Sequence, residues 1–166
     1  KISKKYSKLL DWSLKKPKDF WSSVWDFTKV KGYKNFKFKF SGNLFKHKFL
    51  INSKLNFAEN LLSKTDKSKA ITFISENGFR EERTWKNLHD SVANLQDFFS
   101  KIKVINRDRV AAYTINSIET VEAFLATSSI GAIWSSCSPD FGVNGVIERF
   151  KQIKPKILFI TDRYYY

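Results

Sequence analysis

The chain has 166 residues, of which 42% are apolar and 16% aromatic, and a chain of this size and composition can bury one hydrophobic core. This composition excludes a mostly disordered chain, and no apolar run approaches the roughly 20 residues that a membrane-spanning helix needs. The formal net charge is +14, which makes a polyanionic partner one alternative to consider. Residues 1–8 are polar and basic without a following signal-peptide-like stretch, so we expect a cytoplasmic protein with no membrane partner.

The positive charge is concentrated at the N-terminus. Residues 1–54 contain 15 Lys and three acidic residues, whereas residues 55–166 contain 15 basic and 13 acidic residues. Lys occurs here together with many Phe, Ile and Asn residues, a pattern that an A+T-rich genome produces without any binding function. A surface that binds a polyanion is the alternative explanation.

The first 54 residues are expected to form a basic, aromatic-rich lead-in region. Residues 6–15 favour a short helix, and Pro17 stands at the start of a second helix, where proline is tolerated. Apolar residues then recur at spacings of three and four, which predicts an amphipathic helix with a wide aromatic face. Its main stripe is Phe20, Val24 and Phe27, and its neighbouring stripe is Trp21 and Trp25.

Residues 35–40 alternate Phe with Lys, which predicts an edge strand with one solvated face. Interleaved Phe and Lys could also stack nucleic-acid bases. No recognised single-strand-binding pattern accompanies them, and we expect no nucleic-acid partner.

From residue 55 the pattern changes to that of a second region, residues 55–166. Asn56 and Glu59 resemble a capping box and predict a short helix that ends at Leu62. Residues 70–75 and 80–84 then favour two strands, and the Asn77-Gly78 pair between them is a strong signal for a hairpin turn.

Thr84 is expected to cap the helix that follows the hairpin. Apolar residues recur along this helix at spacings of four, three and four, which predicts one buried face. That face comprises Leu88, Val92, Leu95 and Phe99.

The remaining residues alternate between strand and helix patterns. Residues 109–113, 133–136 and 156–161 favour strands. Ser117 is expected to cap a helix that contains Val121, Phe124, Leu125 and Ser128, and a second helix over residues 144–152 ends before Pro155. The order βαβαβ predicts an α/β fold with a parallel sheet and helices packed against it.

In such sheets ligands bind beyond the carboxyl ends of the strands, which here are the loops of residues 114–117, 136–143 and 162–166. Within the chain, however, no cluster of side chains at metal-ligand spacing and no nucleophile–base arrangement is apparent. Cys137 is the single cysteine, and His47 and His89 are 42 positions apart; we expect all three to be structural or surface residues. Residues 127–131 contain one Gly and no following Lys, so their small side chains indicate close packing of a helix against the sheet and no phosphate loop.

Residues 108–159 resemble the early sheet of the adenylate-forming acyl-CoA synthetases. Within them, the run GAIWSSCSPDFG at residues 131–142 is similar to the acetoacetate-activating members in particular. Shorter matches are LNFAENLL at residues 55–62, the helix start Thr84-Trp85, and DFW at residues 19–21. The resemblance covers nearly the whole chain and is weakest over residues 29–50.

This resemblance implies an ATP-dependent acid–thiol ligase. Such an enzyme joins ATP, with Mg²⁺, to acetoacetate, releases pyrophosphate, and lets the thiol of coenzyme A displace AMP. The phosphate-binding loop with its lysine, the adenine and ribose motifs and the late catalytic lysine are not found in these 166 residues. We therefore expect the chain to be an incomplete part of the AMP-binding domain, to need the remainder of its own polypeptide, and to be inactive alone.

One candidate contact region is implied by the same resemblance. Ser138, Pro139, Asp140 and Phe141 match the position where related enzymes line the channel for the pantetheine arm of coenzyme A. Related enzymes have glycines at Pro139 and Asp140, so a simple turn before the next helix is an equal alternative. Arg149 matches an arginine of relatives and is expected either to form a structural ion pair or to lie at an interface.

Three other functions remain open. The chain could belong to a sibling short-chain acyl-CoA synthetase, because most of the acyl pocket is not in this sequence. It could be a small basic module that binds a polyanion through its first 54 residues. A folded, non-catalytic partner protein is the third possibility, although its sheet would have unpaired edges that favour aggregation.

Overall fold

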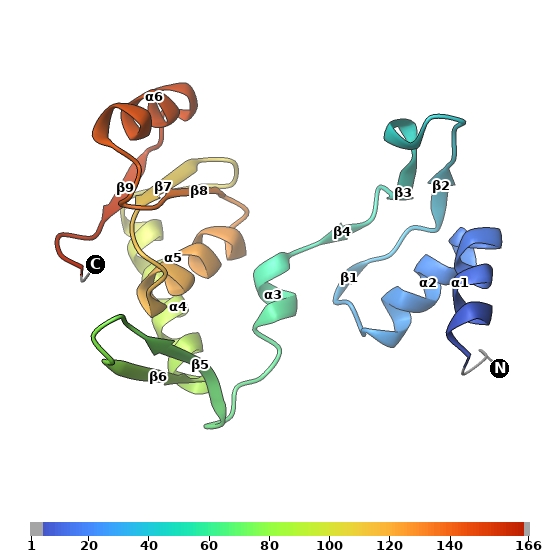
Figure 1. Cartoon of the computed structure of the whole chain (residues 1–166), viewed down its shortest axis with the longest axis horizontal. Helices are drawn as coiled ribbons and strands as arrows, with labels where there is room; N and C mark the ends of the chain where they lie inside the picture. Colours follow the sequence, from blue (N-terminus) through green and yellow to red (C-terminus); the bar gives the residue numbers. More distant parts are fainter. Residues whose placement is uncertain (1–4, 165–166) are drawn as a thin grey trace. The chain divides into compact units, whose positions relative to one another are not determined.

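The computed structural model describes residues 5–164 and divides the chain into two compact units that meet between Asn56 and Phe57. This boundary lies two residues beyond the one expected from the sequence. Each unit has its own elements, which Figure 1 shows in chain order. Among the described residues, no helix is long and apolar enough to cross a membrane.

The N-terminal unit starts with two helices, α1 (Tyr6–Lys15) and α2 (Pro17–Phe27). Both lie where the sequence predicts them, and Pro17 is the first residue of α2 because a helix needs no N–H donor at that position. The predicted aromatic stripe is only partly right, since Phe27 is 87% exposed and Trp25 is the buried residue of α2. Phe27 is the last residue of the helix.

Two small antiparallel ribbons complete the N-terminal unit. Strand β1 (Gly32–Tyr33) pairs with β4 (Lys54–Leu55), and β2 (Lys37–Lys39) pairs with β3 (Lys48–Ile51), with a 3₁₀ turn η1 (Leu44–Lys46) before β3. The strand expected over residues 35–40 is therefore shorter than predicted. Phe38, Phe40 and Phe49 form a cluster of edge-to-face and stacked rings across this second ribbon, a contact that stabilises cross-strand pairs.

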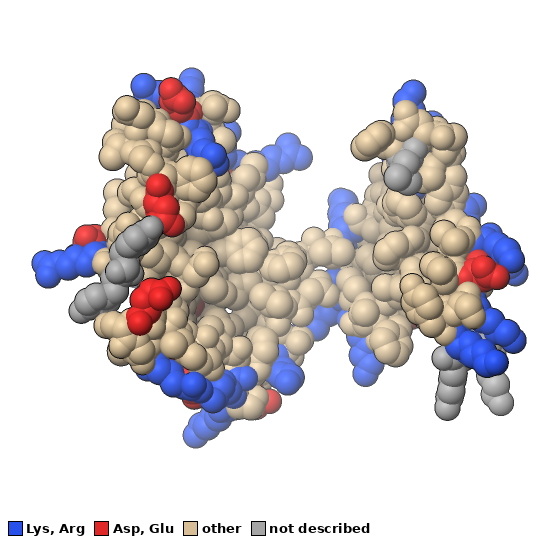
Figure 2. All heavy atoms as spheres, viewed as in Figure 1, with Lys and Arg blue, Asp and Glu red and all other residues tan. Residues whose placement is uncertain are grey.

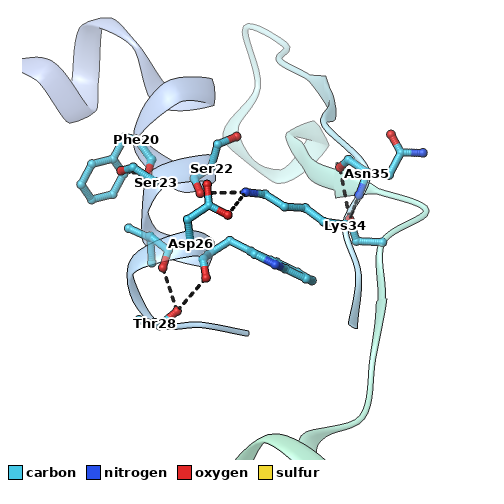
Figure 3. A network of polar contacts seen from close by, with 10 residues as sticks. Phe20, Ser22, Ser23, Asp26, Thr28, Lys34 and Asn35 are labelled. Carbon is cyan, nitrogen blue, oxygen red and sulfur yellow. Dashed lines mark hydrogen bonds and ion pairs between the residues drawn. The ribbon is translucent and has the colours of Figure 1, made fainter. Parts of the chain in front are cut away.

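One lysine of the N-terminal unit is a structural residue, as Figure 3 shows. Lys34 Nζ lies 2.6 Å from the Asp26 carboxylate and donates to the Ser22 carbonyl at 3.0 Å. Its side chain is only 13% exposed, so it is withdrawn from solvent while its ammonium group is paired. Lys34 thus connects the segment after β1 to helix α2.

The C-terminal unit begins with helix α3 (Phe57–Leu61) and a hairpin of strands β5 (Lys69–Ile74) and β6 (Arg80–Thr84). The hairpin is confirmed, and Gly78 takes a positive φ of 82° at its tip, a conformation that a residue without Cβ adopts at little cost. Thr84 caps α4 (Trp85–Lys101) through a hydrogen bond from Asn87 N–H to its hydroxyl at 3.1 Å. Both the cap and the start of this helix are therefore as predicted.

The rest of this unit is the predicted βαβαβ arrangement. Strands β7 (Arg109–Tyr113), β8 (Ile133–Cys137) and β9 (Ile157–Ile160) form a parallel sheet in the order β8-β7-β9. Helix α5 (Ile118–Ser129) connects β7 to β8, and α6 (Val143–Ile153) connects β8 to β9. The α/β class is thus confirmed.

Two apolar clusters hold helices on the two faces of this sheet. The larger cluster joins α3, α4, α5 and β7, and its buried members are Ala58, Leu88, Val92, Phe99, Val104, Val110, Leu125 and Ala126. The smaller cluster joins β7, β8 and α6 through Ala111, Cys137, Val146 and Phe150. Side chains alternate between the two faces along a strand, which is why Val110 and Ala111 belong to different clusters.

Candidate functional site

An open cleft of about 1700 Å³ lies in the C-terminal unit, beyond the carboxyl ends of the parallel strands. All three loops that the sequence analysis selected contribute to its lining. The hairpin forms the opposite wall, and sequence reasoning did not include it. The lining comprises residues 72–77, 79, 114–116, 120, 136–140 and 162–164.

The charge of the cleft is informative about its ligand. Its charged lining residues are three carboxylates, Glu76, Asp140 and Asp162, and one guanidinium, Arg163. Arg163 Nε lies 3.9 Å from the Asp162 carboxylate, so a negative charge lies beside the positive charge of this lining. Since like charges repel, this lining disfavours a phosphate-rich ligand, whereas its Ser, Thr and Asn side chains can hydrogen-bond an uncharged polar chain.

The loop after β8 contains the four residues selected from the sequence, and the structure separates them. Ser138, Pro139 and Asp140 line the cleft. Phe141 is not among the lining residues, and its ring instead lies under Arg149, whose guanidinium carbon is 4.4 Å from the ring centroid. The contact that the structure gives Arg149 is thus a cation–π contact with Phe141.

Hydrogen bonds within this loop define its shape. The Ser138 hydroxyl donates to the Asp140 carboxylate at 2.6 Å, and the Phe141 N–H donates to the Ser138 carbonyl at 3.1 Å. The second bond closes a β-turn over residues 138–141. The turn before the next helix, which was the alternative expectation, is therefore present, and three of its four residues line the cleft.

A cluster of hydroxyl groups joins the ends of β7 and β9 at the base of the cleft. Thr114 Oγ1 lies 2.7 Å from Thr161 Oγ1 and 2.9 Å from Thr120 Oγ1. Thr120 donates to the Ile115 carbonyl at 2.8 Å, and its own N–H donates to the Ser117 hydroxyl at 3.3 Å. This cluster stabilises the loop after β7 and confirms Ser117 as the cap of α5.

The hairpin wall is connected to α5 by one arginine. Arg83 on β6 donates from Nε to the Glu122 carboxylate at 2.9 Å and from a terminal nitrogen to the Glu81 carboxylate at 2.6 Å. Glu122 is only 6% exposed. Its hydrogen bond with Arg83 raises the pKa of the Arg83 guanidinium. The sequence signal for this contact is a glutamate placed directly after Val121, within the predicted apolar face of α5.

The other residues considered from the sequence lie outside this site or beneath it. Cys137 is buried at the end of β8 and touches the base of the cleft. His89 contacts the Leu62 carbonyl at 3.0 Å, and His47 contacts the Ser41 carbonyl, so both take part in structural hydrogen bonds. Over residues 5–164, no group of three or more His, Cys, Asp and Glu side chains is placed to hold a metal ion.

The small residues before β8 serve packing. Thr127 is fully buried on α5, and Gly131 adopts a positive φ of 72° in the turn that follows. The Gly131 carbonyl accepts a hydrogen bond from the Arg107 N–H at 3.0 Å. The turn is therefore occupied by contacts of the chain with itself, as expected for a helix end beside the sheet.

A parallel sheet with a cleft beyond the carboxyl ends of its strands is the arrangement of ligand-binding α/β enzymes. The family model of the AMP-binding enzyme matches residues 59–165, which is more than half of the chain. The chain therefore belongs to the AMP-binding enzyme family.

Comparison with individual relatives shows which members of this family the chain is similar to. The chain is 42% identical over 162 residues to the acetoacetyl-coenzyme A synthetase of Rhizobium meliloti (strain 1021), covering 97% of this chain and 25% of that protein. The solved structure of an acetoacetyl-CoA synthetase from Streptomyces lividans matches with a TM-score of 0.85 and 30% identity, covering 99% of this chain and 26% of that one. The resemblance seen in the sequence to the acetoacetate-activating branch is confirmed.

A further relative bears a different name. The malonamoyl-CoA synthetase vrtB of Penicillium aethiopicum is 33% identical over 170 residues and is covered to 24% of its length. The chain thus spans about a quarter of the length of the relatives that it matches.

Proposed function

We propose that this chain supplies the first part of an ATP-dependent acid–thiol ligase that activates acetoacetate. The observation that carries the proposal is the 42% identity to an acetoacetyl-coenzyme A synthetase over 97% of the chain. A carboxylate reacts poorly with a thiol until a leaving group is attached to it. The ligase would form the acyl adenylate from ATP, release pyrophosphate, and then let the coenzyme A thiol displace AMP.

Within this ligase, the cleft is assigned to the arm of coenzyme A. The pantetheine arm is uncharged and carries two amide groups, and the lining of the cleft is rich in hydroxyl and amide side chains and has more carboxylates than cations. The contact residues assigned here are Ser138, Pro139 and Asp140. Phe141 supports the loop from the side of α6.

ATP and Mg²⁺ are assigned to the part of a longer polypeptide that these 166 residues do not include. The sequence contains no Gly-rich loop followed by lysine, which is the usual means of holding a triphosphate. The acidic lining of the cleft also disfavours the phosphates. The partners of this chain are therefore small molecules, acetoacetate, ATP and coenzyme A, together with the rest of the enzyme.

We propose first the class of acid that the ligase activates and then one member of that class. Acetoacetate and malonamate, the acids in the names of the relatives, both carry a second carbonyl group at the third carbon. Acetoacetate is preferred because identity to the acetoacetyl-CoA synthetases is higher, 42% compared with 33%. A cytoplasmic location is proposed with it, because a single unpaired cysteine suits a reducing compartment.

The test is to read the encoding frame past codon 166 and to assay the complete product. We expect the frame to continue into a Ser/Thr/Gly-rich loop with a lysine, and the purified product to form AMP with acetoacetate faster than with malonamate, acetate or propionate. A stop codon directly after residue 166 would contradict the ligase proposal. Faster turnover of acetate would replace acetoacetate with a sibling substrate while keeping the reaction.

Polyanion binding by the N-terminal unit is a second candidate, favoured by one observation. Residues 1–54 contain 15 Lys against three acidic residues, and Lys side chains are spread over the face of that unit that Figure 2 shows. Lys34 is excluded from such a surface because its side chain is withdrawn and paired. Heparin affinity that disappears on adding moderate salt, and is unchanged in Lys34→Met, would support this function.

A further inference from the structure

Tyr113 is the last residue of β7, and its side chain extends to the loop that follows β8. Its hydroxyl donates to the Pro139 carbonyl at 2.8 Å, and the Phe141 carbonyl lies 3.2 Å from the same oxygen. The next residue, Thr114, donates its N–H to the Cys137 carbonyl at 3.1 Å. The end of β7 therefore holds this loop both where it starts and in its middle.

The opposite side of the loop is held by α6. Arg149 lies over the Phe141 ring, which keeps this ring beside α6 and outside the lining of the cleft. Between these two contacts the loop can present only a few residues to the cleft, and those residues are Ser138, Pro139 and Asp140. The contacts from β7 and α6 thus decide which side of the loop a ligand meets.

The hydroxyl of Tyr113 has a different role from its ring. The ring packs against the smaller apolar cluster of Ala111, Cys137, Val146 and Phe150, so it contributes to the fold whether or not the hydroxyl is present. The hydroxyl contacts only loop carbonyls among the hydrogen bonds recorded for it. Removing it would leave the Pro139 carbonyl without this donor, and the loop would relax toward other conformations.

We propose that Tyr113 is a positioning residue for the thiol substrate, with Arg149 as its counterpart on the other side of the loop. Acting through the carbonyls of Pro139 and Phe141, the Tyr113 hydroxyl sets the shape of the wall against which the arm of coenzyme A lies. This inference rests on the proposed function, which assigns the cleft to that arm. It adds Tyr113 on β7 and Arg149 on α6 to the proposed coenzyme A site. Both lie outside the loop and determine affinity for the thiol substrate without touching it.

Tyr113→Phe tests the proposal because it removes the hydroxyl and keeps the ring. The measurement is a titration of the full chain, labelled with ¹⁵N, with pantetheine as the probe. We expect the amide resonances of residues 138–142 to shift and the dissociation constant for pantetheine to rise about threefold to tenfold, the loss expected for one hydrogen bond. The matched control is Tyr33→Phe on β1, whose side chain is exposed, and we expect it to leave both readouts unchanged.

Arg149 provides a second, independent variant. Arg149→Met keeps an unbranched apolar side chain but removes the cation over the Phe141 ring, and we expect it to weaken pantetheine binding in the same direction. Arg149→Lys keeps a cation in reach of the ring, and we expect it to retain most of the affinity. A merely structural role would lower the denaturation midpoint of both Arg149 variants without separating their affinities.

Two negative results have different meanings. Unchanged pantetheine affinity in both Tyr113→Phe and Arg149→Met would overturn this inference alone, because the cleft would still bind the arm. An unaltered chain that is folded and shows no response to pantetheine at any soluble concentration would overturn the assignment of the cleft, and the inference with it.

Discussion

Asp108 illustrates how single charged residues stabilise the C-terminal unit at the end of the sheet opposite to the cleft. Its carboxylate lies 2.8 Å from Lys156 Nζ and accepts a hydrogen bond from the Ile105 N–H at 2.9 Å. The bond from Lys156, together with the one from Ile105, lowers the pKa of Asp108 below its ordinary value. The residue before β7 is thereby connected to the residue before β9, two segments far apart in the sequence.

The first prediction concerns the pH dependence of this contact. Because the pKa of Asp108 is lower in the folded chain than in the unfolded chain, its stabilisation is fully present above the unfolded value, about 3.9, and is lost as the pH falls through the folded value. We expect Asp108→Asn to lower the free energy of unfolding at pH 7, and the difference from the unaltered chain to shrink as the pH falls below about 4. Urea unfolding at several pH values measures this, with Asp97→Asn, an exposed position of α4, as the control.

The second prediction concerns the arginine that connects the hairpin to α5. Glu122 is buried and lies 2.9 Å from Arg83, whereas Glu119 is exposed and lies 3.8 Å from the same guanidinium. We expect Glu122→Ala to lower the free energy of unfolding by about 2 kcal/mol, and Glu119→Ala to change it by less than about 1 kcal/mol. Equal effects in chemical denaturation would show that burial of the pair does not matter.

Helix ends set the boundaries of the elements that surround the cleft. Both long helices of the C-terminal unit begin at a hydroxyl side chain, Thr84 for α4 and Ser117 for α5. In each case the oxygen accepts a hydrogen bond from the backbone N–H three residues later, one of the N–H groups that have no partner within a helix. These caps were identified from the sequence because they depend only on neighbouring residues.

The third prediction follows at this scale. We expect Thr84→Ala to lower the free energy of unfolding by about 1 kcal/mol, since it removes the acceptor for the Asn87 N–H. Thr84→Ser keeps the oxygen and should retain most of this stability. Thermal unfolding followed by circular dichroism separates the two variants, and an equal loss in both would assign the effect to the lost methyl group instead of the cap.

At the scale of the whole molecule, the two outer strands of the parallel sheet are each paired along one edge only. Among the described residues, β8 and β9 each pair with β7 and with no other strand. Leu158 and Ile160 on β9 are 44% and 64% exposed. Unpaired edges with exposed apolar residues favour pairing with other chains.

The fourth prediction is that the 166-residue chain associates with itself at this edge. We expect its sedimentation coefficient to rise with concentration, and Ile160→Lys to reduce this rise, because a charged residue on an edge strand disfavours pairing. Lys48→Arg, on a strand of the other unit, keeps its charge and serves as the control. A monomer at all concentrations would show that the edge is protected without any further chain.

The sequence alone determined most of the secondary structure and the class of protein. The α5 cap at Ser117, the hairpin turn at Asn77-Gly78 and the βαβαβ order depend on residues close together in the chain, so local patterns were sufficient to identify them. The run at residues 131–142 indicated the acetoacetate-activating branch by its resemblance to that family. Phe27 and Trp21 of α2 are exceptions, because both were expected on a packed aromatic face and are 87% and 43% exposed.

Only the tertiary structure decided which residues form the cleft and what holds it. Tyr113 and Pro139 are 26 positions apart, and Arg83 and Glu122 are 39 positions apart. The chain brings each pair together because parallel strands place their carboxyl ends at one edge of the sheet and because the hairpin folds back onto α5. Contacts of this kind depend on the geometry of packing between distant segments, which local spacing in a single sequence does not contain.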